Sequence, residues 1–219
     1  MPAFTGMAQK SAVIYSKTGP AIYHSHHDMI RFWERAVKRA ALPVRMTGGF
    51  NPRPRIVFPH ALGLGITSLH EEVELEFHTG IARRELLDRL MGAAGDTLAI
   101  RDAVNLPPVK KSRQIVASGY SITGWTALSR DKLPGAVDAI LSMTEIPVER
   151  GAPDSRRTMD IRPYLRELRY EEAGGALRLG LAHTQAGSAR PDEIAKLAAG
   201  MTGMDHHDLG IEKTSMRLE

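Results

Sequence analysis

The chain has 219 residues, 42% of them hydrophobic and 25% charged, a composition typical of one large or two small globular domains. It contains no cysteine, which excludes disulfides, thiolate-ligated zinc sites and iron–sulfur clusters, and a cysteine nucleophile. No segment has the length of apolar sequence that a membrane span needs, and residues 1–15 lack the apolar run of a signal peptide. We therefore expect a cytoplasmic protein.

In the first half of the chain, strand and helix patterns alternate. Strand-like residues at 12–15 are followed by helical spacing of apolar residues over 25–42, where Ser25 and Asp28 resemble a capping box and Pro43 stops the helix. The remaining expected elements are a short strand at 56–58, a strand at 71–78, a helix at 81–95 and a strand at 98–107.

After "PPVKKS" (107–112), which is typical of a linker, the pattern returns in a longer form. We expect strands at 114–123, 176–183 and 210–218, helices at 132–143 and 190–201, and an extended or mixed segment at 158–172. The sequence thus predicts the α+β class, with two tandem ferredoxin-like β-α-β-β-α-β units and antiparallel sheets. Their predicted bounds are 1–108 and 109–219.

The net charge of +4 is unevenly distributed. Seven cations between residues 31 and 55 are opposed only by Glu34, so this segment carries 7 − 1 = +6 and the rest of the chain carries −2. Prolines and glycines in "GGFNPRPR" (48–55) are expected to hold the loop in shape, and the prolines to discourage strand pairing there. The pattern favours contact with phosphates, although a solvated helix face beside a structural turn explains it too.

Two other groups of residues invite a chemical interpretation. His24, His26 and His27 lie at the start of the basic helix, and His24 or His26 is a candidate general base for cleaving RNA without a metal. Surface or capping histidines are the simpler explanation, and no metal site is predicted. On the strand at 71–78, Glu72, Glu74 and Glu76 share one side, which we expect to face solvent or to pair with the basic helix.

Several motifs together resemble the bacterial family of radical SAM-linked proteins. They are Ser25, His26 and Asp28; Glu34-Arg35-Ala36 with Arg39-Ala40; Gly49-Phe50-Asn51-Pro52 with Pro54; Gly63 and Gly65; "MDIRPYL" (159–165); and "SARPDEI" (188–194). His27 and Ala61-Leu62-Gly63 depart from the family pattern. The "GFNPRP" turn is also distantly similar to CRISPR repeat-processing endonucleases, which use tandem ferredoxin-like folds.

The first resemblance implies a partner of a cobalamin-binding radical-SAM protein that is encoded nearby, in a setting of ribonuclease and ribosomal-protein genes. Because this chain has no cysteine, the radical-SAM cluster would reside in that partner. We therefore expect a noncatalytic accessory protein without a cofactor of its own, which binds RNA (rRNA or tRNA) or presents a substrate.

The residues predicted to contact nucleic acid are cations on the helix and loop, together with an aromatic and an amide at the turn: Arg31, Arg35, Lys38, Arg39, Arg45, Phe50, Asn51, Arg53 and Arg55. Two alternatives stay open. One is a metal-independent RNA endonuclease that uses His24 or His26, and the other is a protein-interaction module without RNA contact.

Overall fold

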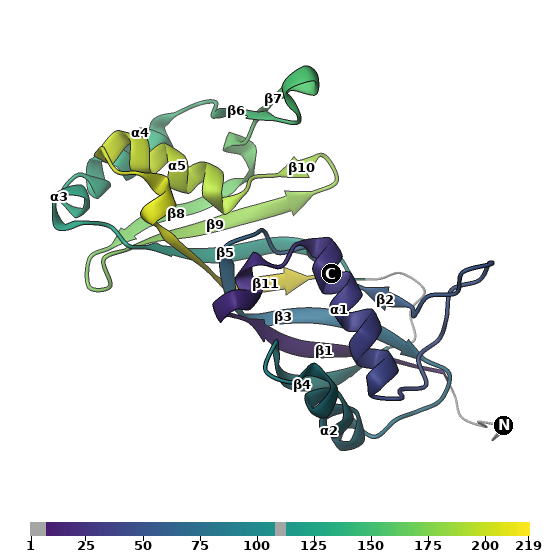
Figure 1. The fold of residues 1–219 in the computed structure, drawn as a ribbon. Helices are drawn as coiled ribbons and strands as arrows, with labels where there is room; N and C mark the ends of the chain where they lie inside the picture. The colour runs from purple at the N-terminus through teal and green to yellow at the C-terminus, as the bar shows by residue number, and fades with distance from the viewer. Residues whose placement is uncertain (1–7, 108–112) are drawn as a thin grey trace. The chain divides into compact units, whose positions relative to one another are not determined.

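The computed structural model describes residues 8–107 and 113–219, and it divides the chain into two compact units, Met1–Gln114 and Ile115–Glu219 (Figure 1). The domain boundary predicted between residues 108 and 109 lies outside the described residues. Each unit has its own strands and helices and is described by itself below.

Unit 1 combines a four-stranded antiparallel arrangement with two helices. Its elements are β1 (Gln9–Lys17), the 3-10 turn η1 (Gly19–Tyr23), α1 (His26–Arg39), β2 (Ile56–Val57), β3 (Ile66–Phe77), α2 (Arg83–Ala94) and β4 (Ala99–Leu106). The strand order is β2-β3-β1-β4, with every neighbouring pair antiparallel. At the centre of this sheet, Val13 on β1 lies opposite Val73 on β3 and Ala103 on β4.

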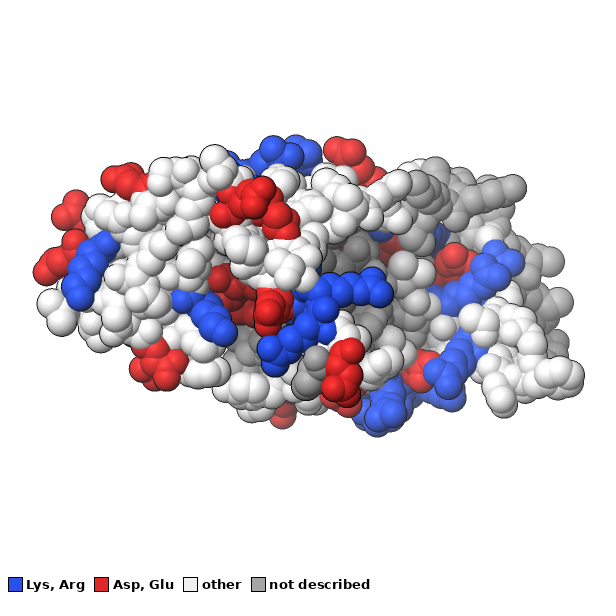
Figure 2. Space-filling view, turned by 90° about the horizontal axis from the view of Figure 1, so that it is seen from above, with Lys and Arg blue, Asp and Glu red and all other residues white. Residues whose placement is uncertain are grey.

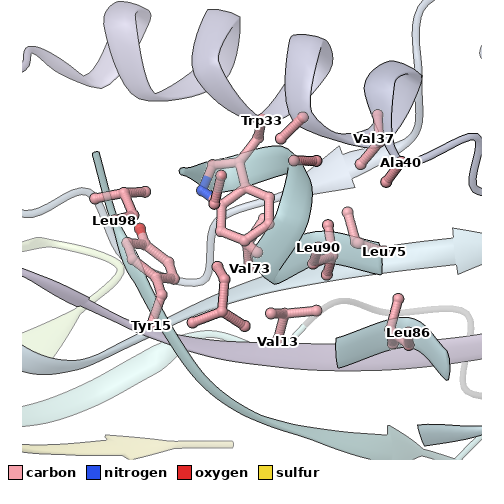
Figure 3. Close-up of a cluster of buried hydrophobic side chains, with 14 of the residues drawn as sticks. Val13, Tyr15, Trp33, Val37, Ala40, Val73, Leu75, Leu86, Leu90 and Leu98 are labelled. Atoms are coloured by element: carbon pink, nitrogen blue, oxygen red, sulfur yellow. The ribbon is translucent and has the colours of Figure 1, made fainter. Parts of the chain in front are cut away.

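The core of unit 1 lies between one face of this sheet and helices α1 and α2 (Figure 3). Alternate residues of β1 and β3 point into it, as the strand period of two requires. Trp33 of α1 is completely buried and packs edge-on against Tyr15, with 5.2 Å between ring centroids. Buried aromatic residues of this size contribute much of the stability of a small core, so Trp33 fixes α1 on the sheet.

Both ends of α1 are defined by local hydrogen bonds. At its start, Ser25 and Asp28 form the predicted capping box, with the Ser25 hydroxyl accepting from the Asp28 amide and the Asp28 carboxylate accepting from the Ser25 amide. The predicted end at Leu42 is wrong, because the helix ends at Arg39. Ala41 adopts a left-handed φ of 48°, and the Leu42 amide donates to the Val37 carbonyl, which is the pattern of a Schellman motif.

Unit 2 contains three helices and further antiparallel strands. Its elements are β5 (Ile115–Thr123), α3 (Ala127–Arg130), α4 (Leu133–Ser142), β6 (Pro147–Arg150), η2 (Pro153–Ser155), β7 (Arg157–Asp160), η3 (Arg162–Tyr164), β8 (Leu165–Glu171), β9 (Ala176–Thr184), β10 (Gly187–Ser188), α5 (Pro191–Thr202), η4 (His206–Asp208) and β11 (Gly210–Leu218). Strand β5 pairs with β9 and β11, β9 also pairs with β8 and β10, and β6 and β7 form a separate hairpin.

Leucines of β9 provide the centre of the core of unit 2. Leu177, Leu179 and Leu181 are almost completely buried, and so are Ile140 of α4 and Ile194 of α5. Since the leucines alternate along the strand, one face of β9 is apolar and covered by helices.

The predicted α+β class and antiparallel strand pairing are confirmed, with five α-helices within residues 8–107 and 113–219. In the same residues, none of the helices is both long and apolar enough to cross a lipid bilayer.

Candidate nucleic-acid interface

One face of α1 carries the cations that the sequence placed there. Arg31, Arg35, Lys38 and Arg39 are all exposed, while Phe32, Ala36 and Val37 are buried. At roughly 100° per residue, the four cations occupy an arc of roughly 100° on one side of the helix. The fold therefore anchors the cationic side chains on a rigid element whose opposite face is held by the core.

The segment between α1 and β2 is a hairpin that projects away from the sheet (Figure 1). The Arg55 amide donates to the Arg45 carbonyl, the Thr47 amide donates to the Arg53 carbonyl, and Met46 forms an antiparallel bridge with Pro54. The prolines were expected to discourage strand pairing, and this segment forms isolated bridges without a strand. Because proline lacks a donor, pairing stops at isolated bridges, with the arms held by the amides of neighbouring residues.

The tip of this hairpin presents an aromatic ring to solvent. Phe50 is completely exposed, at 106% of the reference area, and Asn51 beside it is exposed too. Gly49 precedes them with a φ of 102°, a conformation that favours glycine. A large apolar side chain with no intramolecular packing has nothing to contribute to the fold, so the tip is available for contact with another molecule.

Two of the predicted cations are neutralised by carboxylates of the same unit. Arg53 lies 3.8 Å from Glu34, and Arg55 lies 3.2 Å from Glu76. The Arg53 contact joins the hairpin to α1 and neutralises the acid beside the cationic face, whereas Arg55 is drawn toward β3. The expectation of one surface with all seven cations unneutralised is therefore not met at these two positions.

The other five cations keep their charge available. Among the described residues, no carboxylate lies within ion-pair distance of Arg31, Arg35, Lys38, Arg39 or Arg45, although Arg31 is close enough to Asp28 to lower its pKa. Figure 2 shows Lys and Arg side chains in separate groups over one face of the molecule, with Asp or Glu beside several of them. On α1, Asp28 and Glu34 lie near the cations, but neither forms an ion pair with Arg31, Arg35, Lys38 or Arg39.

The structure separates the two candidate catalytic histidines. His26 packs its ring edge-on against Phe58, with 5.2 Å between centroids, and its pKa is lowered by burial and by the charges of His27 and Lys17. His24 instead lines a cleft of about 690 Å³ together with Arg35 and Arg39. Of the two histidines, His24 lines this cleft and His26 does not.

A buried lysine lies next to His24, and no local pattern in the sequence predicts it. Lys17, at the end of β1, is 2% exposed, and its ammonium donates to the backbone carbonyl of His24 at 2.9 Å. Burial lowers the pKa of Lys17, and the charge of Glu71 opposes this effect. The contact fixes the backbone at His24, so Lys17 positions that residue.

The predicted exposure of the glutamates on β3 is wrong. Glu74 is buried and lies 2.6 Å from Lys10, Arg113 contacts both Glu72 and Glu74, and Glu76 pairs with Arg55. None of these partners belongs to α1, so the expected pairing with the basic helix is wrong too. The carboxylates serve the fold of unit 1 and do not form a cation site.

In unit 2, Asp205, His206 and His207 place one potential ligand atom each within 4.8 Å of one another. The Asp205 carboxylate accepts from the His207 amide, which caps η4 and lowers the pKa of Asp205. This hydrogen bond explains the position of Asp205 without a metal.

These features define an α+β protein whose first unit carries a cationic helix face, an exposed aromatic hairpin tip and an adjoining cleft. The chain belongs to a family described as an uncharacterized protein conserved in bacteria (DUF2344), whose model matches residues 10–191. No curated protein matches the chain. Among solved structures, it is similar to an unknown protein from Galdieria sulphuraria, at 12% identity over 95% of this chain and 100% of that chain, with a TM-score of 0.27.

Proposed function

We propose that this protein is an RNA-binding accessory protein that presents its RNA to a radical-SAM enzyme. The observation that supports RNA binding most directly is the α1 face, where four exposed cations have no ion-paired carboxylate among the described residues. An exposed cation with no acid beside it attracts phosphates, and binding releases the condensed counterions of the nucleic acid.

We further propose that both units are ferredoxin-like. The strand order of unit 1 and the pairing of β5, β8, β9 and β11 in unit 2 are compatible with that topology, which presents one sheet face or its helices to a ligand. The radical-SAM partner rests on the resemblance of the motifs in residues 25–65, 159–165 and 188–194 to radical SAM-linked proteins.

The exposed Phe50 favours the binding of single-stranded RNA over the binding of a duplex. An aromatic ring at the tip of a projecting hairpin stacks on a base that is not already stacked within a helix. In this arrangement the phosphates of the RNA bind electrostatically to the cations of α1, and one base stacks on Phe50 without a strong sequence preference.

A salt titration tests the electrostatic part. Fluorescence anisotropy of a labelled single-stranded RNA is measured between low and physiological salt for the wild type and for a variant with Arg35, Lys38 and Arg39 changed to Ala. If each cation neutralises one phosphate, the slope of log K against log salt falls in magnitude by about 2, since each contributes about 0.7 for single strands.

A control triple variant with the same change in charge removes Arg156, Arg169 and Arg217, which are exposed but paired with carboxylates. It should leave the slope close to that of the wild type. Equal losses in the two variants would show that only net charge matters, and the absence of RNA binding at any salt would leave a protein-interaction module as the function.

The partner is tested by co-expressing the chain, carrying an affinity tag, with the radical-SAM protein that the resemblance implies is encoded nearby. We expect the two to co-purify and to remain together through gel filtration. If the two proteins elute separately with and without RNA, the accessory role in radical-SAM chemistry is refuted, while RNA binding is unaffected by that result.

The cleft favours a second candidate function, a metal-independent RNA endonuclease with His24 as the base. His24, Arg35 and Arg39 line the same cleft, so a base for a 2′-hydroxyl and cations for the phosphates of a bound strand border one space. Incubating RNA in EDTA tests this candidate. Cleavage that disappears in His24→Ala and persists in His26→Ala supports it, and RNA that stays intact with the wild type excludes it.

A further inference from the structure

The cleft beside α1 has two walls of different chemistry. Arg35 and Arg39 lie on the α1 wall together with His24, Asp28 and Phe32, and residues 92–97 form the opposite wall. The opposite wall contains the end of α2 and the turn that follows it. The volume of the cleft, about 690 Å³, is within the range of small-molecule sites and exceeds the space that a single ion or water molecule requires.

The α2 wall offers hydrogen-bond acceptors. The last carbonyls of a helix have no donors from the same helix, and α2 ends at Ala94 with its carbonyl end at the cleft. Asp96 adds a carboxylate on the same wall. A ligand that fits both walls therefore has an anionic group for Arg35 and Arg39 and N–H donors for the α2 end.

Both walls also contribute apolar atoms to the cleft. Phe32, Ala93 and Ala94 are buried side chains that line the cleft, and they suit the flat face of a ring. Phosphate at one end, a planar ring in the middle and exocyclic amino groups at the other end are together the features of a nucleotide.

Two further observations concern residues that line the cleft. Gly92 lies inside α2, where glycine destabilises a helix relative to alanine. A Cβ added at Gly92 meets no atom within 4 Å, so a side chain at this position would occupy open space at the cleft. In addition, Nδ1 of His24 is buried without a hydrogen-bond partner among the described residues. A buried ring nitrogen normally has a partner, and a ligand that displaces the atoms covering this nitrogen would supply one.

We infer that this cleft binds one nucleotide with an amino-bearing base (adenine, guanine or cytosine), its phosphate at Arg35 and Arg39 and its amino group at the end of α2. This inference deepens the proposed function, because the nucleotide would come from the bound RNA. Uracil carries no exocyclic amino group, so it leaves the acceptors of the α2 wall with fewer donors.

The experiment fills the cleft without removing any charge. Gly92→Leu places a good helix former at the cleft wall, and Gly200→Leu is the matched control: both glycines are third from the end of a 12-residue helix, and a Cβ at either meets nothing within 4 Å. Both variants are expected to fold, which circular dichroism verifies. Binding of AMP, CMP, GMP and UMP and of the single-stranded RNA is then measured by calorimetry and anisotropy.

The expected result has two parts. UMP binds the wild type about tenfold more weakly than the other three nucleotides, which corresponds to the loss of one hydrogen bond of ordinary strength. Gly92→Leu weakens the binding of AMP, CMP and GMP at least about tenfold. Gly200→Leu leaves both their binding and the salt slope for RNA unchanged.

Two results would overturn the inference: equal affinity of wild type and Gly92→Leu for every mononucleotide, or no mononucleotide binding while RNA still binds. The opposite pattern, with mononucleotides bound in the cleft and RNA not bound at any salt, overturns the proposed RNA function instead and assigns the cleft to free nucleotides.

Discussion

The buried ion pair between Lys10 and Glu74 gives the sharpest test of how unit 1 is held together. The Glu74 side chain is completely buried, the Lys10 side chain is 9% exposed, and the ammonium and carboxylate lie 2.6 Å apart. Replacing Glu74 by Ala leaves the ammonium buried without this partner. Breaking a buried pair from one side costs about 3–5 kcal/mol, because the remaining charge keeps its desolvation penalty.

A surface pair in the same unit provides the control. Arg89 and Glu85 are also 2.6 Å apart, but their side chains are 43% and 48% exposed. Because water and salt screen such a pair, Glu85→Ala should cost no more than about 0.5 kcal/mol. The two pairs have the same separation, but Glu74 also accepts from Arg113, so a difference between the variants reports burial together with the loss of that second contact.

The assay is urea unfolding followed by tryptophan fluorescence. Trp33 belongs to unit 1 and Trp125 to unit 2, so a Trp125→Phe background makes Trp33 report unit 1 within the full chain. With an m-value of about 1.5 kcal/mol/M, Glu74→Ala should lower the midpoint by about 2–3 M and Glu85→Ala by about 0.3 M or less.

A hydrophobic double variant separates the two possible causes of a loss. Lys10→Met with Glu74→Leu removes both charges and keeps the volume, so it should cost much less than Glu74→Ala alone. The reasoning is refuted if Glu74→Ala costs no more than Glu85→Ala, or if the double variant is as unstable as Glu74→Ala.

Three further predictions concern the ends of α1 and the hairpin tip. Ala41→Gly should stabilise unit 1 by about 0.5–1 kcal/mol in the same urea assay, because it relieves a left-handed alanine, and a loss of stability would contradict this. Ser25→Ala should cost about 1 kcal/mol by removing the helix cap. Hydrogen bonds from Ser25 lower the pKa of Asp28. The stability that these bonds provide is therefore present above the unfolded-state pKa of Asp28 and is lost as the pH falls through its lower folded-state pKa. Ser25→Ala should flatten this acid dependence of the stability, and an unchanged pH profile would count against the cap as its cause. Phe50→Ala should weaken the binding of single-stranded RNA by about 1–3 kcal/mol, with no change in the salt slope of binding or in the stability of the protein. An altered salt slope would show that the ring does not act by stacking.

Local sequence determined the elements and much of the exposed surface of α1. The Ser25–Asp28 capping box, the helical spacing around Trp33 and the alternation along β3 each depend on residues a few positions apart, and the structure has all three. The cations of α1 are exposed for the same reason, since the apolar stripe that is buried leaves only the opposite face for them. Proline and glycine likewise placed the hairpin between α1 and β2.

Tertiary structure decided which charges remain available and which histidine shares a site with them. Strand pairing brings Lys10 beside a glutamate more than sixty residues away, and the hairpin brings Arg53 to Glu34 and Arg55 to Glu76, so charges that the sequence shows as free are neutralised. The cleft that His24, Arg35 and Arg39 line forms only because the end of α2 packs beside α1. Ion pairs and clefts depend on distances between residues far apart in the chain, and those distances are set by register and packing, which no local pattern contains.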